Sequence, residues 1–217
     1  MSAITLIRHG QANSTATDEH SYDRLSDLGH RQAAWLGEHL RSTGQHHERL
    51  YTGTLRRHIE TAEGMAMDIE PIRDPRLNEL EYFTLAGLLR EQHGIPFPTE
   101  QQQFITHLPL VFDHWRADRI EGAPETYTAF QDRIRDAMDE IAGTGGTALV
   151  VTSGGLIANV MGQRMSLDVP QTARLAIAIF HTSLHQLFPI GDHLSPTLFN
   201  ATPHLDRADR QLSRTNI

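Results

Sequence analysis

The chain has 217 residues, of which 39% are hydrophobic and 21% charged, so it is long enough to bury the core of a globular domain. A formal net charge of −8, with no basic run of five or more residues, excludes a general nucleic-acid binder. The absence of cysteine excludes disulfides, iron–sulfur clusters and thiolate zinc sites. No apolar stretch reaches the roughly 20 residues that a membrane helix needs, and the N-terminus leads directly into an apolar run. We therefore expect a cytoplasmic protein that binds neither nucleic acid nor a membrane.

The first part of the chain alternates short apolar runs with stretches of helical periodicity. In order, it predicts a strand at 4–7, a polar loop at 11–22, a helix from about 26 that stops at Gly44, a strand at 50–53, a helix capped by Thr54, and an extended piece at 72–73. The inner face of the helix after Thr54 is predicted to carry Leu55, Ile59, Ala62 and Ala66.

The second part begins with a change of pattern. Prolines and irregular apolar spacing predict a small helical cap inserted at about 83–123. A helix from Pro124 to about Gly143 follows, then a buried strand at 147–152, a helix at 156–165, strands at 174–180 and 184–188, and a polar end that frays from about Leu205. This order predicts the α/β class: a three-layer α/β/α sandwich with a mainly parallel sheet, forming one domain over residues 1–217.

Two strand ends carry the residues that attract attention. The first strand stops at Arg8-His9-Gly10, where the arginine offers a planar fork of donors for phosphate and the histidine can serve as a nucleophile. Groups just past the carboxyl end of a strand line the ligand crevice of an α/β sheet. The later strand stops at Ser153-Gly154-Gly155, where a serine cap and backbone N–H groups favour an anion. The alternatives without a function are an exposed turn at the first strand end and an ordinary helix cap at the second.

Several motifs in order resemble the histidine phosphatase superfamily, which has the phosphoglycerate mutase-like fold. The motifs are Arg8-His9-Gly10-Gln11 with Asn13, Leu25-Ser26-x-x-Gly29-x-x-Gln32-Ala33, Leu55-x-Arg57-x-x-Glu60-Thr61-Ala62-Glu63, Arg76-Leu77-Asn78-Glu79, and the strand and turn of 147–155. The resemblance covers nearly the whole chain. Three segments resemble more narrowly a bacterial branch of that superfamily. They are residues 52–57, the Thr-Ser-Gly-Gly motif at 152–155 and residues 199–205.

The resemblance implies a role for each matching residue. His9 would attack phosphorus and form a phosphohistidine, while Arg8 and Arg57 would clamp the phosphoryl oxygens. Glu79 would protonate the leaving oxygen and later activate water, with Glu81 as its rival. Gly10, Gln11, Asn13, Ser153 and Gly154 are expected to help bind phosphate. The scheme requires no metal and no cofactor.

The departure from the family pattern is Ser153, which stands where the family has a second histidine. A serine hydroxyl can bond a phosphate oxygen but brings no charge, and loss of one such preorganised donor costs about 10²–10³ in rate. The sequence therefore indicates a slow catalyst, or a site completed by another histidine. His204 and His181 are the candidates, with packing or surface roles as the alternative for each.

We accordingly expect a metal-independent phosphohydrolase acting on a small phosphorylated metabolite, a phosphomonoester. The alternatives are a pseudophosphatase that binds a phosphorylated ligand or partner, and, with less support, a mutase. A metal site at His181 and His185 is disfavoured, because four residues along a strand separate side chains by roughly 13 Å. Tyr82, Phe83 and Trp115 either meet an apolar leaving group or form the core of the cap. A homodimer is a family-level expectation.

Overall fold

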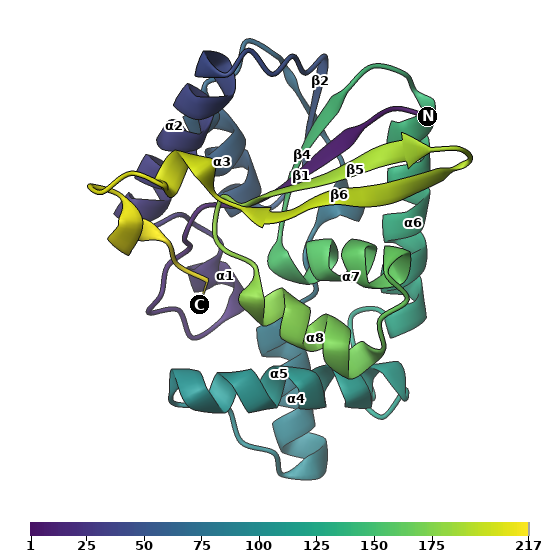
Figure 1. Cartoon of the computed structure of the whole chain (residues 1–217). Coiled ribbons are helices and arrows are strands. Elements are labelled where there is room, and N and C mark those ends of the chain that lie inside the picture. Colours follow the sequence, from purple (N-terminus) through teal and green to yellow (C-terminus); the bar gives the residue numbers. More distant parts are fainter. Residues whose placement is uncertain (217) are drawn as a thin grey trace.

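The computed structural model describes residues 1–216, without the side chain of residue 101. A six-stranded sheet runs through these residues (Figure 1). The strand order is β3-β2-β4-β1-β5-β6. The first four strands of that order are mutually parallel, whereas β5 runs antiparallel to both β1 and β6. The strands are β1 (Ile4–Arg8), β2 (Arg49–Thr52), β3 (Pro71–Arg73), β4 (Ala148–Thr152), β5 (Leu184–Ile190) and β6 (His193–Ala201).

The helices cover both faces of the sheet, because alternate residues of each central strand point to opposite sides. Leu6 and Val150 belong to the core shared with α6, α7 and α8. Ile7 and Val151 pack instead against apolar side chains of α2 and α3. The helices are α1 (Glu19–Tyr22), α2 (Asp27–Ser42), α3 (Arg56–Met65), α4 (Tyr82–His93), α5 (Gln101–Arg116), α6 (Tyr127–Gly143), α7 (Gly154–Arg164) and α8 (Val169–Ala178). The predicted three-layer fold is confirmed.

The strand predicted at 174–180 is wrong, since these residues lie mostly in helix α8. The alternating run of alanine and isoleucine fits either structure, but a capping box settles the choice. The Asp168 carboxylate accepts from the Gln171 backbone N–H at 2.7 Å, and the Gln171 side chain accepts from the Asp168 N–H at 2.9 Å. The prediction overlooked this start signal. The strand predicted at 184–188 is present as β5.

The end of the chain also differs from the prediction. Strand β6 forms a hairpin with β5 about Gly191, whose φ is +60°. Beyond it come short 3₁₀ helices at Pro203–Leu205 and Gln211–Ser213. The predicted fraying is wrong, because the backbone of Thr215 accepts a hydrogen bond from the His181 N–H at 2.8 Å. The tail is tied to the carboxyl end of the sheet.

Residues of the predicted cap form α4 and α5 at one end of the molecule, beyond α7 and α8 (Figure 1). Their buried side chains, among them Leu89 and Phe112, belong to the same core as one face of the sheet. Trp115 is also part of this core and is only 2% exposed. Within residues 1–216, no helix combines the length and the apolar character needed to cross a membrane.

Candidate active site

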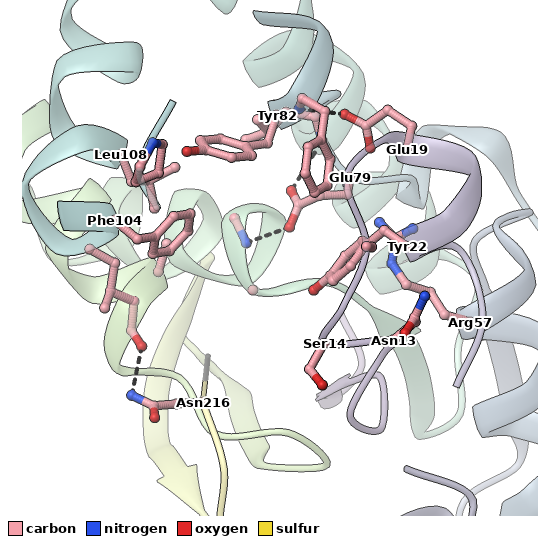
Figure 2. Close-up of a pocket in the computed structure, with 18 of the residues that line it drawn as sticks. Asn13, Ser14, Glu19, Tyr22, Arg57, Glu79, Tyr82, Phe104, Leu108 and Asn216 are labelled. Atoms are coloured by element: carbon pink, nitrogen blue, oxygen red, sulfur yellow. Dashed lines mark hydrogen bonds between the residues drawn. The ribbon is translucent and has the colours of Figure 1, made fainter. Parts of the chain in front are cut away.

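A cavity of about 490 Å³ opens where the carboxyl ends of β1 and β4 meet the loops after β2 and β3. Its polar end contains six of the residues singled out from the sequence, namely Arg8, His9, Asn13, Arg57, Glu79 and Gly154. Figure 2 shows Arg57, Asn13 and Tyr22 on one side of this cavity and Glu79 above its centre. The sheet thus brings together side chains from four separate parts of the chain.

His9 is held with a defined tautomer. Its backbone N–H donates to Thr152 O at 2.8 Å, which ties it to β4, and its side chain is buried. Nδ1 lies 2.7 Å from Gly10 O. Because a carbonyl can only accept, Nδ1 carries the proton and Nε2 carries the lone pair. Burial lowers the pKa of His9 well below its usual value, and the neighbouring charges of Arg57 and Arg8 lower it further. His9 is therefore a neutral, nucleophilic imidazole near pH 7.

The two arginines are buried, and each has a donor without a partner in the described part of the chain. Nη1 of Arg8 donates to the backbone carbonyls of Ile179 and, at 2.7 Å, Asn216. Nη1 of Arg57 donates to the Asp23 carboxylate at 3.0 Å. Within residues 1–216, the buried Nε of both arginines has no hydrogen-bond partner. Unpaired donors of this kind are rare in native interiors, and guanidinium donors match the oxygens of phosphate.

Asp23 supplies what the start of α3 lacks. The predicted cap, Thr54, is wrong, because Leu55 occupies the N-cap position and makes no side-chain cap bond. The Asp23 carboxylate instead accepts from the backbone N–H groups of Arg56 at 2.9 Å and Arg57 at 3.2 Å. The same carboxylate thus fixes both the helix start and the arginine side chain. The Arg57 guanidinium also lies 5.0 Å from the centre of the Tyr22 ring.

Glu79 and its rival Glu81 differ in environment. The Glu79 carboxylate accepts from the backbone N–H of Gly155 at 2.7 Å and lines the cavity. Gly155 makes room for it, since a Cβ there would lie 2.5 Å from a Glu79 oxygen. Burial raises the pKa of Glu79, although the Gly155 N–H and Arg57 act in the opposite direction. Glu81 is exposed, accepts from the Thr84 hydroxyl, and does not line this cavity.

Two of the other predicted phosphate ligands are turned to structural partners. The Gln11 side chain accepts from the Ser26 hydroxyl at 2.8 Å and does not line the cavity. The Gly10 N–H donates to the Thr61 hydroxyl at 3.0 Å. Asn13 does line the cavity, with its amide donating to Ser21 O at 2.9 Å.

Ser153 leads to a residue that the sequence reasoning missed. It occupies the N-cap of α7 but makes no side-chain cap bond, because its hydroxyl lies 2.6 Å from Nε2 of His58. The His58 ring is fully buried, and its centre lies 5.7 Å from that of His9. Gly53 leaves the space for it, since a Cβ there would come within 2.2 Å of His58 Nδ1. Neither Ser153 nor His58 lines the cavity.

The missed histidine reflects an error in the predicted face of α3. Leu55 and Ile59 are only partly buried and Ala66 is exposed, whereas Arg57 and His58 point inward. When a helix buries polar residues, the pattern of its apolar residues does not identify its buried face. The available signal was the position of His58 directly after Arg57, the arginine for which the resemblance implies a phosphate contact.

The two candidate replacement histidines have different positions. The His181 ring centre lies 5.8 Å from that of His9, and its Nδ1 is 2.9 Å from the Thr215 hydroxyl. His204 is buried with Nε2 2.8 Å from the Thr182 hydroxyl, packs near His39, and does not reach the cavity. The structure therefore brings His181, but not His204, beside His9, and neither of the two lines the cavity. Among the described side chains, no three of His, Asp or Glu are grouped so that they could hold a metal ion.

Comparison with known proteins matches residues 4–202 to the family described as the histidine phosphatase superfamily (branch 1). A 2,3-bisphosphoglycerate-dependent phosphoglycerate mutase of Tropheryma whipplei is 32% identical over 142 residues, which are 61% of this chain and 59% of that protein. The corresponding Corynebacterium kroppenstedtii mutase is 39% identical over 105 residues, 42% of each chain. The chain thus matches about half the length of these curated relatives.

Solved structures show the same fold. The Entamoeba histolytica phosphoserine phosphatase, in complex with phosphoserine, superposes with a TM-score of 0.68 at 16% identity, covering 94% of this chain and 100% of the other. A mycobacterial glucosyl-3-phosphoglycerate phosphatase in complex with inorganic phosphate superposes with a TM-score of 0.66 at 21% identity. The match covers 95% of this chain and 100% of the other.

Proposed function

Because the chain belongs to the histidine phosphatase superfamily, we propose that it is a phosphohydrolase that cleaves phosphomonoesters through a phosphohistidine on His9. The observation that carries the proposal is the state of His9, a buried neutral imidazole whose Nδ1–H is fixed by Gly10 O. Two guanidinium groups, whose Nε donors have no partner among the residues that the structure describes, stand at the same end of the cavity.

The chemistry proceeds in two half-reactions. Nε2 of His9 attacks phosphorus, the bond to the leaving oxygen breaks, and that oxygen takes its electron pair and the proton of Glu79. The Glu79 carboxylate then removes a proton from water, whose oxygen attacks phosphorus and displaces His9. Arg8 and Arg57 stabilise the charge that spreads over the phosphoryl oxygens. The raised pKa of Glu79 supports its role as the acid of the first step.

Ser153 and His58 act as a pair in this scheme. The His58 ring centre lies 5.7 Å from that of His9, and neither residue of the pair lines the cavity, so we assign them the positioning of His9 and not contact with the phosphoryl group. The cavity wall then carries one cation fewer than the family pattern implies. We expect the rate to be about 10²–10³ below that of a site with a second histidine on the wall.

The test is direct trapping of the intermediate. The protein is mixed with an activated aryl phosphate, quenched in alkali and digested, and phosphate is sought on the peptide that contains His9. We expect an adduct that His9→Ala abolishes and that the exposed-residue control His20→Ala retains. Measurable phosphate binding without adduct or turnover would identify a pseudophosphatase instead, and return of the phosphoryl group to a second acceptor would identify a mutase.

A further inference from the structure

The cavity changes character with distance from His9. The polar end, with Arg8, His9 and Arg57, is where phosphate is proposed to bind and is called the phosphate end below. Beyond it, the cavity wall is aromatic and aliphatic, and α4, α5 and the segment between them supply most of it. The aromatic lining consists of Tyr22, Tyr82, Phe83, Phe97, Phe104 and Phe112. Figure 2 shows Tyr82, Phe104 and Leu108 facing the cavity from the side opposite Tyr22.

Two of the polar side chains in this region already have hydrogen-bond partners. The Tyr82 hydroxyl lies 2.9 Å from Nδ1 of His107, while the aromatic ring of Tyr82 lines the cavity. The Glu19 carboxylate accepts from the Phe83 backbone N–H at 2.7 Å. A ligand entering this region therefore meets mainly carbon surface.

The charges on the wall disfavour an anionic leaving group. Among the lining residues the structure describes, the arginines are Arg8 and Arg57, both at the phosphate end, while Glu19 and Glu100 line the remainder. The chain contains no lysine that could approach from elsewhere. A carboxylate or second phosphate on the leaving group would be desolvated here without a cation to pair with.

We propose that the substrate is a phosphomonoester with an uncharged, largely apolar leaving group of the size of one or two aromatic rings. This inference rests on the proposed phosphohydrolase function. The cavity volume, about 490 Å³, accommodates such a group together with the phosphate. The preference arises from the apolar area removed from water at the transition state, which a small or charged leaving group does not provide.

The experiment compares alkyl phosphates whose leaving oxygens have similar acidity, so that chemistry does not mask binding. The compounds are ethyl phosphate, 2-phenylethyl phosphate and 3-phosphoglycerate. We expect kcat/KM for 2-phenylethyl phosphate to exceed those of the other two by about 100-fold, the gain expected from burying one aromatic ring. Equal values for ethyl and 2-phenylethyl phosphate, or a preference for 3-phosphoglycerate, would overturn the proposal.

Variants locate the effect. Phe104→Ala should lower the 2-phenylethyl to ethyl ratio of kcat/KM about 10-fold, whereas Phe188→Ala, a 51%-exposed phenylalanine of β5, should leave the ratio unchanged. If Phe104→Ala does not fold, Phe97→Ala tests the same wall. A ratio that neither wall variant changes refutes the assignment. Phosphohistidine formation without any leaving-group preference would refute this inference alone, whereas no adduct with any compound would refute the proposed function.

Discussion

Nε2 of His58 lies 2.6 Å from Oγ of Ser153, and neither residue is more than 1% exposed. A side chain from the start of α3 and one from the start of α7 thus share a single buried site beside His9. The space next to Ser153 is already filled by an imidazole that comes from position 58.

This arrangement predicts that a histidine at position 153 is incompatible with His58. Ser153→His should destabilise the protein by about 1–3 kcal/mol through overpacking, and adding His58→Ala should restore most of the loss because one imidazole then replaces the other. Urea unfolding of the two single variants and the double variant measures the coupling. Strictly additive changes would show that the two positions do not share the site.

The two adjacent arginines of α3 provide a matched pair. Arg57→Gln should lower kcat/KM about 10²-fold or more, since it removes a buried donor from the phosphate end. Arg56→Gln should change it little, because the Arg56 side chain is 68% exposed and its ion pair with Glu60 contributes at most about 1 kcal/mol. Steady-state kinetics with both variants is sufficient. Similar losses in the two would contradict the assigned clamp.

The pH profile follows from opposite pKa shifts in the cavity. Glu79 must be protonated to donate, so kcat/KM should fall as pH rises through its raised pKa. His9 must be neutral, and its lowered pKa keeps it so well below pH 6.5. Activity should therefore be greatest on the acid side of neutrality. Glu79→Gln should lower the rate by about 10²–10⁴-fold and abolish the fall of kcat/KM at rising pH that is due to Glu79. Glu81→Gln should retain the wild-type pH profile. A profile that Glu79→Gln leaves unchanged in shape would assign the acid elsewhere.

Buried histidines outside the cavity predict acid lability. Burial lowers the pKa of both His185 and His204 to about 3. The unfolded chain takes up these protons below about pH 6.5 and the folded chain does not, so stability falls as pH drops from about 6.5 to 3, by about 1.4 kcal/mol per pH unit for each histidine. Denaturant unfolding at several pH values should show a shallower slope for His185→Gln. The exposed control His193→Gln should follow the wild type, and equal slopes in all three would exclude this cause.

The sequence was most informative where one local rule sufficed. The apolar run ending at Arg8-His9-Gly10 placed β1, and the adjoining loop brought His9 to the cavity. The prediction was wrong at α8, where the apolar run fits both strand and helix and only the Asp168 cap decides between them. His58 was not found because its burial depends on how α3 is rotated, and Asp23, more than 30 residues earlier in the chain, fixes the start of that helix.

The bond from Arg8 to Asn216 O joins residues 208 positions apart. The Arg8 side chain is therefore fixed only when a contact of very high sequence separation has formed. A partly folded chain in which Asn216 has not yet reached Arg8 lacks this fixed guanidinium group. Under the proposed function, phosphate binding should therefore report on complete folding, because a ligand stabilises only the state in which its site is formed.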